Sequence, residues 1–247
     1  ESATKEESLR VLEKIKDKIT PQQAHKIGGP FDNEYKKLKK QEIAKAVKKD
    51  PYIIKQLDPE VLEILDIFEA IDNSEVKNIP ELFSYTNSKW LAANLESKVI
   101  PYLKSHPNLD EKEISRFLNK IGDKITIKQA ADIGENFSLQ HKNWIKKSIE
   151  DDPFNLMDFE KEIDEIPGIE EIIDGSQAKD EPRLFPYAST KWLMTNLESK
   201  VIPRLHGKNL DKDEWILLLN KIGDKITEKQ AVELGKEFEK IWHSSRH

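Results

Sequence analysis

The sequence contains no cysteine, little glycine and no long apolar run. None of its 247 residues is cysteine, which excludes disulfides, thiolate metal sites and cysteine nucleophiles. Only 9 residues are glycine, which disfavours a sandwich or barrel built on glycine-rich turns. No segment approaches the roughly 18 consecutive apolar residues that a membrane-spanning helix needs. We therefore expect neither a membrane span nor a disulfide-stabilised domain.

The residues that are abundant favour exposed helices around a modest core. Charged residues make up 35% of the chain, and hydrophobic residues, with five tryptophans, make up 37%. A disordered chain would have fewer hydrophobic residues and a larger net charge. The net charge of −6 disfavours nucleic acid as a partner, because phosphate binding needs clustered lysine and arginine.

The sequence repeats itself, and this is its strongest signal. Residues 82–103 match residues 184–205, so that Trp90 corresponds to Trp192 and Pro101 to Pro203 at an offset of 102. After a one-residue gap the match continues through residues 108–137 and 209–238, and a diverged third copy includes residues 14–28. We therefore predict a tandem array of helical units of about 102 residues, called repeats below.

The repeat boundaries divide the chain into three parts. Residues 1–81 form the C-terminal part of a first repeat with connecting helices, residues 82–183 a complete second repeat, and residues 184–247 the N-terminal part of a third. Because the chain starts and stops inside repeats, we expect further copies outside these 247 residues.

Capping motifs mark where helices begin. A threonine precedes a glutamine by three residues in all three copies, which predicts a capping box before a helix; the pairs are Thr20 with Gln23, Thr126 with Gln129, and Thr227 with Gln230. A second box is predicted upstream, from Asp110 with Glu113 and Asp211 with Glu214. The helix after it carries an apolar stripe at helical spacing, and we expect it to end at a left-handed glycine, Gly122 or Gly223.

Prolines punctuate the remaining helical segments. Pro101 either kinks the periodic segment 88–103 or starts a new short helix. Further helices are expected at residues 42–49, 142–150 and 58–71, and the counterpart of the last is expected to break at Pro167-Gly168. The prediction is an all-α protein with about five helices per repeat and no strand, elongated or solenoid-like.

No set of residues predicts catalysis or metal binding. The segment around Gly122 faintly resembles part of a calcium loop, but its first and twelfth positions would be Phe117 and Lys128, which cannot bind calcium. The six histidines show no ligand spacing. The lysine-rich stretch 36–49 does not recur at equal strength in the next copy, so we interpret it as a solvated helix face. We therefore expect no enzyme activity, cofactor or metal site.

One repeated polar face is the candidate for partner binding. Its residues are Lys89, Asn94, Glu96 and Lys98 in one copy and Lys191, Asn196, Glu198 and Lys200 in the next. Recent duplication alone would also explain this identity, and that alternative stays open. Trp90 and Trp192 are expected to be core or packing residues, because tryptophan buries a large area.

The leading functional hypothesis is a non-enzymatic helical repeat scaffold that binds another protein. A structural spacer, or a helical accessory domain of an enzyme outside these residues, are the alternatives. Composition slightly favours a secreted or cell-surface bacterial protein over a cytoplasmic one. Neither the partner's identity nor the oligomeric state follows from the sequence.

Overall fold

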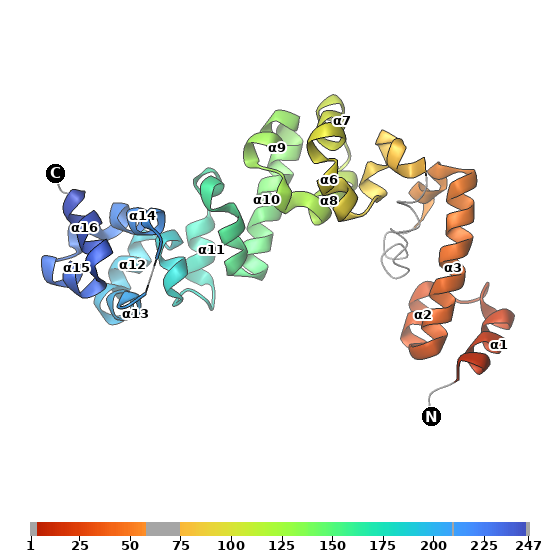
Figure 1. Ribbon diagram of the computed structural model, residues 1–247, viewed down its shortest axis with the longest axis horizontal. Helices are drawn as coiled ribbons and strands as arrows, with labels where there is room; N and C mark the ends of the chain where they lie inside the picture. Colours follow the sequence, from red (N-terminus) through yellow and green to blue (C-terminus); the bar gives the residue numbers. More distant parts are fainter. Residues whose placement is uncertain (1–3, 58–74, 209, 246–247) are drawn as a thin grey trace. The chain divides into compact units, whose positions relative to one another are not determined.

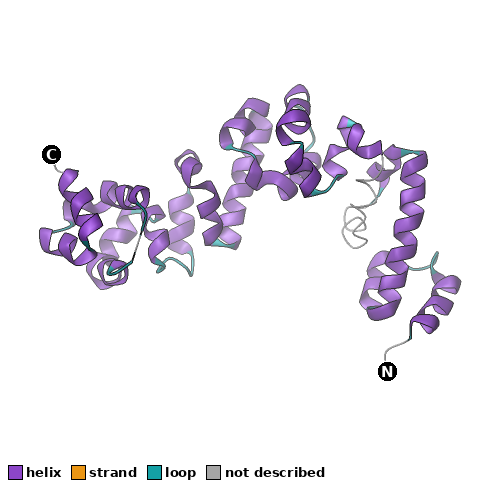
Figure 2. Ribbon diagram, in the orientation of Figure 1, coloured by secondary structure: helices purple, strands orange, loops and turns teal. Residues whose placement is uncertain are grey.

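The computed structural model is helical throughout the part of the chain that it describes, residues 4–57, 75–208 and 210–245, where no strand occurs (Figures 1 and 2). The all-α prediction is confirmed over these residues. The chain divides into two compact units, unit 1 at Glu1–Phe137 and unit 2 at Ser138–His247. Each is described by itself.

The described residues of unit 1 up to Tyr85 form three α-helices and three short 3₁₀ helices. They are α1 (Lys5–Ile15), α2 (Pro21–Ile27), α3 (Gly29–Lys49), η1 (Pro51–Gln56), η2 (Glu75–Asn78) and η3 (Pro80–Tyr85). One apolar cluster joins them, through buried residues that include Leu12, Tyr35, Val47, Ile54 and Leu82. The Tyr35 hydroxyl donates to the backbone oxygen of Ile19 at 3.1 Å, so this buried tyrosine keeps a polar partner.

The rest of unit 1 contains the capped helices predicted from the sequence. Its elements are α6 (Ser88–Ala93), the π-helical turn η4 (Leu95–Val99), α7 (Ile100–Ser105), α8 (Glu111–Ile121), η5 (Gly122–Lys124) and α9 (Ile127–Ile133). Helix α10 (Glu135–Asp151) begins here and continues into unit 2. The apolar stripe of α8, Ile114, Phe117, Leu118 and Ile121, is buried.

From η7 onwards, the elements of unit 2 follow the same order as those of unit 1 from η3 onwards. Before them come α10, which crosses the boundary between the units, η6 (Pro153–Glu165) and α11 (Ile169–Gly175). They are followed by η7 (Pro182–Tyr187), α12 (Thr190–Asn196), the π-helical turn η8 (Leu197–Val201), α13 (Ile202–Leu205), α14 (Lys212–Ile222), η9 (Gly223–Lys225), α15 (Glu228–Leu234) and α16 (Lys236–Ser244).

The threonine capping boxes are confirmed at all three positions. At α9 the Gln129 amide donates to Thr126 Oγ1 at 3.1 Å, and the Thr126 amide donates to Gln129 Oε1 at 2.8 Å. The upstream box is complete only in unit 2, between Asp211 and Glu214. In unit 1 Asp110 accepts from the Glu113 amide at 2.7 Å, but the Glu113 carboxylate lies near the Tyr102 hydroxyl, whose pKa it raises, and the second bond of the box is not made.

The prediction of left-handed glycines at the ends of α8 and α14 is wrong. Gly122 has φ −58° and Gly223 has φ −60°, both right-handed, because the chain continues directly into a 3₁₀ turn. The glycines with positive φ come one helix later, at Gly134 (152°) and Gly235 (115°), where the chain turns into α10 and α16.

Two expected helices are longer than the sequence pattern indicated. The segment 42–49 is the last part of α3, which begins at Gly29, and the segment 142–150 belongs to α10, which begins at Glu135. In both, a single glycine separates the helix from the capped helix before it. The expected break at Pro167-Gly168 is confirmed, since η6 ends at Glu165 and α11 begins at Ile169. The expected helix 58–71 lies outside the described residues.

A lysine near the end of α8 donates hydrogen bonds to backbone oxygens in and just after η3. Lys120 Nζ donates to the backbone oxygens of Ser84 and Thr86, both at 2.7 Å. In unit 2 the aligned Lys221 donates to the Ala188 oxygen at 2.8 Å and to Glu170 at 2.6 Å. The last carbonyls of a helix lack partners within it, so a charged donor from a neighbouring helix satisfies them.

Removing a threonine cap should cost stability without changing the fold. Thr126→Ala and Thr227→Ala each delete one accepting hydroxyl, and each is expected to lower the free energy of unfolding by about 1 kcal/mol. Urea unfolding measures this. An unchanged unfolding midpoint in both variants would contradict the energetic role of the caps.

Removing the lysine contact should cost more. Lys120→Met keeps the aliphatic stem but leaves the Ser84 and Thr86 oxygens without their charged donor, and it should destabilise the protein by about 2 kcal/mol. The control is Lys112→Met on the same helix, where the side chain is exposed. Equal unfolding curves for the two variants would show that the contact contributes nothing.

Candidate functional site

The repeated polar face lies on and beside the two π-helical turns. In η4 the Val99 amide donates to the Asn94 oxygen at 3.1 Å, and the Ile100 amide donates to the Leu95 oxygen, each five residues back. The Ile202 amide bonds the Leu197 oxygen in the same way. Because proline has no amide and its ring clashes with the carbonyl four residues earlier, Pro101 disfavours an ordinary α-turn here. Of the two alternatives for Pro101, a new short helix is observed, starting at Ile100.

The two asparagines of the candidate face stabilise the backbone. Asn94 Nδ2 donates to the Trp90 oxygen, and Asn196 Nδ2 donates to the Trp192 oxygen, both at 2.8 Å. These bonds add a side-chain donor to carbonyls just before the α-helix widens into the π-helical turn, and the Trp90 oxygen also accepts from the Asn94 amide at 3.1 Å. The asparagine identity therefore has a structural cause, and the lysines and glutamates remain the stronger candidates for partner contact.

The two tryptophans are half-buried rather than fully buried. Trp90 packs on Phe83 with ring centroids 5.2 Å apart, and Trp192 packs on Phe185 at 5.6 Å. Lysines lie over the same rings, with Lys98 Nζ 5.5 Å from the Trp90 centroid and Lys200 Nζ 6.0 Å from that of Trp192. The packing role expected for these tryptophans is present, but each also positions a cation.

The other charged residues of the face differ between the copies. Glu96 Oε1 accepts from Nε2 of the capping residue Gln129 at 2.6 Å, which ties η4 to the start of α9. Its counterpart Glu198 is exposed. Lys89 and Lys191 are exposed at the starts of α6 and α12. Sequence identity at these positions is therefore not accompanied by identical contacts.

Unit 1 has a groove beside Lys98, with a volume of about 460 Å³. Its walls include apolar and aromatic side chains, Pro80, Phe83, Pro101 and Tyr102, and its polar edge includes Lys77, Asn78, Lys98 and His106. The Phe83 and Tyr102 rings meet edge to face at 5.6 Å. Sequence reasoning identified Lys98 but missed the groove, because η2 and η3 contribute half of it.

In unit 2 a carboxylate occupies the corresponding place. Asp180, which aligns with Asn78, lies 2.9 and 3.2 Å from Lys200 Nζ through its two carboxylate oxygens. Arg204, which aligns with Tyr102, donates from Nη1 to the Asp180 backbone oxygen at 3.0 Å. The hydrogen bond from Lys200 lowers the pKa of Asp180.

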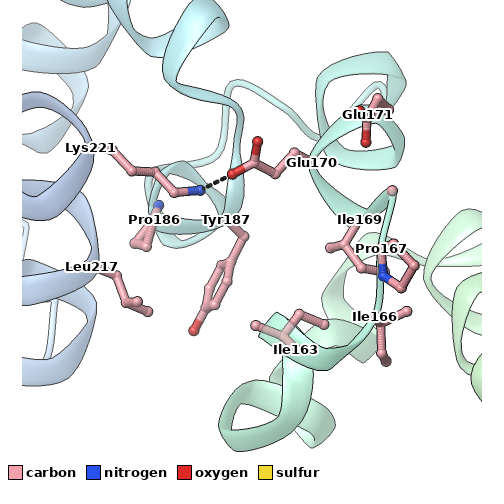
Figure 3. Close-up of a pocket in the computed structure, with 11 residues that line it drawn as sticks. Ile163, Ile166, Pro167, Ile169, Glu170, Glu171, Pro186, Tyr187, Leu217 and Lys221 are labelled. Atoms are coloured by element: carbon pink, nitrogen blue, oxygen red, sulfur yellow. Dashed lines mark hydrogen bonds and ion pairs between the residues drawn. The ribbon is translucent and has the colours of Figure 1, made fainter.

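A second hollow lies within unit 2 and has a different character (Figure 3). Its volume is about 280 Å³, and Ile163, Ile169, Tyr187 and Leu217 contribute to its wall. The ion pair between Lys221 and Glu170, drawn as a dashed line, lies at its edge. Both charges are thus already paired, and the hollow contains none of the candidate face residues.

Metal and membrane features are absent from the described parts of the chain. Within residues 4–57, 75–208 and 210–245 no group of three histidine or acidic side chains could hold a metal ion. Over the same ranges, no helix combines the length and apolar character needed to cross a bilayer.

Comparison with protein-family models, with curated proteins and with solved structures gives no match. The functional argument therefore depends on the residues of this chain.

The groove gives Tyr102 a distinctive alkaline titration. Burial, followed by the negative charges of Glu113 and Glu81, raises its pKa from 10.0 to about 12. A folded pKa above the unfolded one means that this group stabilises the fold fully below pH 10 and that the contribution is lost as pH rises towards 12. We expect Tyr102→Phe to lose less stability than the wild type between pH 9 and pH 11.5 in urea unfolding. Equal losses would contradict the shift.

Proposed function

We propose that this protein is a non-enzymatic helical repeat scaffold that binds another protein through the face on its π-helical turns. The tandem array of about 102-residue repeats is part of this proposal. It is supported by the sequence offset of 102 and by the like order of helices that follows η3 in unit 1 and η7 in unit 2.

The lysine placed over a half-buried tryptophan, present in both units, carries the proposal. Lys98 and Lys200 lie on the π-helical turns η4 and η8, just before a proline, and each is placed over a tryptophan of the α-helix before the turn. Interface contact residues are enriched in aromatic side chains that are partly buried before binding. π-Helical turns also occur frequently at functional sites, because they cost stability that an ordinary helix would keep.

The variation around this motif favours binding over a purely mechanical role. Asn78 and Tyr102 in unit 1 are replaced by Asp180 and Arg204 in unit 2, so the two copies present different charges on like backbones. A spacer needs the packing of its repeats but has no need for a distinct surface on each. Helical repeat proteins use such differences to bind extended partners.

Charge reversal at the two lysines tests the proposal. Proteins captured by the immobilised 247-residue chain are identified, and direct binding of the purified partner is then measured. Lys98→Glu combined with Lys200→Glu should reduce that affinity at least about tenfold, because each lysine is central to its face.

The matched control is Lys128→Glu combined with Lys229→Glu. These aligned lysines are exposed in the first turns of α9 and α15, where a negative charge suits the helix end. The control should bind as the wild type does. Unchanged binding in the Lys98 and Lys200 variant would exclude this face, and a wild-type chain that captures no direct partner would favour the spacer.

A further inference from the structure

The two units differ in the group that lies beside the lysine over the tryptophan. This difference indicates the chemistry of the partner. In unit 2, Lys200 lies beside a negative charge within the chain, the Asp180 carboxylate. In unit 1 the aligned position is Asn78, which is neutral. Across the residues that the structure describes, neither Lys98 nor Lys77 at the groove edge has an ion pair.

The position of Lys98 does not depend on a carboxylate. Its Nζ lies 5.5 Å from the centroid of the Trp90 ring, and Lys200 is placed over Trp192 in the same manner at 6.0 Å. The ammonium group is therefore preorganised at the groove edge before any ligand arrives. A preorganised donor binds an incoming anion with less loss of side-chain entropy.

The apolar wall indicates the rest of the ligand. Phe83, Pro80, Pro101 and Tyr102 line the groove, and its volume of about 460 Å³ accommodates a few side chains. A bare phosphate would use none of this apolar surface. With two lysines at the edge and a net charge of −6 for the chain, broad polyanion binding is also disfavoured.

We infer that the groove of unit 1 binds an acidic peptide segment. One peptide carboxylate would pair with Lys98, as Asp180 pairs with Lys200, and a neighbouring aromatic or aliphatic side chain would pack on Phe83 and Tyr102. This inference rests on the proposed function and specifies the chemistry of the partner at one site. In unit 2 Lys200 is already paired with Asp180, which also lies near Arg204, so Lys200 is not free to pair with a peptide carboxylate.

The probe is a fluorescently labelled library of synthetic hexapeptides composed of aspartate, glutamate, leucine and phenylalanine. Its binding to the full 247-residue chain is followed by fluorescence anisotropy. A second library, with asparagine and glutamine in place of the acids, controls for apolar binding. We expect the acidic library to bind at least about tenfold more tightly than the amide library.

Asn78→Asp is the decisive variant, because it puts a carboxylate where unit 2 has Asp180 and should neutralise Lys98 from within. Asn78 Nδ2 donates to Glu75 Oε2 at 2.8 Å, so Asn78→Asp is always made together with Glu75→Gln, whose amide can donate to the new carboxylate. Asn78→Asp is expected to weaken acidic-peptide binding at least about tenfold, as is Lys98→Met. The reciprocal variant Asp180→Asn frees Lys200 and should add a weaker second site, raising the stoichiometry from one to two peptides per chain. Thermal unfolding confirms that each variant is folded.

Three results would overturn the inference: no binding of the acidic library to the wild type, equal binding of the amide library, or wild-type affinity in Asn78→Asp. The proposed function is tested separately by protein capture. If a captured partner binds Asn78→Asp with wild-type affinity, the scaffold function is supported and the groove is excluded as the binding site. If Asn78→Asp weakens peptide binding but the chain captures no protein, the groove is supported as a peptide site and the scaffold function is excluded.

Discussion

The absence of one backbone amide, at Pro101 and again at Pro203, is the constraint on which the candidate site depends. A continuous α-helix from Ser88 to Ser105 would leave a carbonyl without its donor and bring the proline ring against it. The chain instead widens into a π-helical turn, in which the Ile100 amide bonds the Leu95 oxygen. At the junction the Trp90 oxygen accepts from both the backbone amide and the side-chain amide of Asn94. The irregular turn thus has a cause in sequence, and it is the turn that bears the lysine lying over the tryptophan.

What the sequence predicts well in this protein is local. The threonine boxes need only residues three apart, so Thr126 and Gln129 could be identified without knowing the fold. The handedness of Gly122 could not, because it depends on whether the chain turns back or continues into η5. The contacts of Lys120 could not be predicted either, because its acceptors, the Ser84 and Thr86 oxygens, lie 36 and 34 residues earlier in the sequence. The groove combines η2, η3 and α7, and no single segment indicates it.

Tyr102 in unit 1 and its counterpart Arg204 in unit 2 make different surface contacts, and the capping boxes of α8 and α14 also differ. In unit 1 the Glu113 carboxylate lies near the Tyr102 hydroxyl and raises its pKa, and the capping box of α8 has one of its two bonds. In unit 2 the residue is Arg204, which turns to Asp180, and Glu214 completes its box by accepting from the Asp211 amide at 2.7 Å. The replacement at this position thus accompanies a change in surface charge and a change in the bonding of a helix end.

The positions that are the same in both units and the positions that differ make different kinds of contact. The caps, the π-helical turns and the tryptophans fix the backbone, and their loss would cost stability in either unit. Positions 78 and 102 make different contacts in the two units. Tyr102 packs on Phe83 and Asn78 donates to Glu75 in unit 1, whereas Asp180 and Arg204 form a charge cluster with Lys200 in unit 2. Asn78 leaves Lys98 without a carboxylate among the described residues, whereas Asp180 pairs with Lys200. The proposed specificity for an acidic partner depends on this difference between the two units.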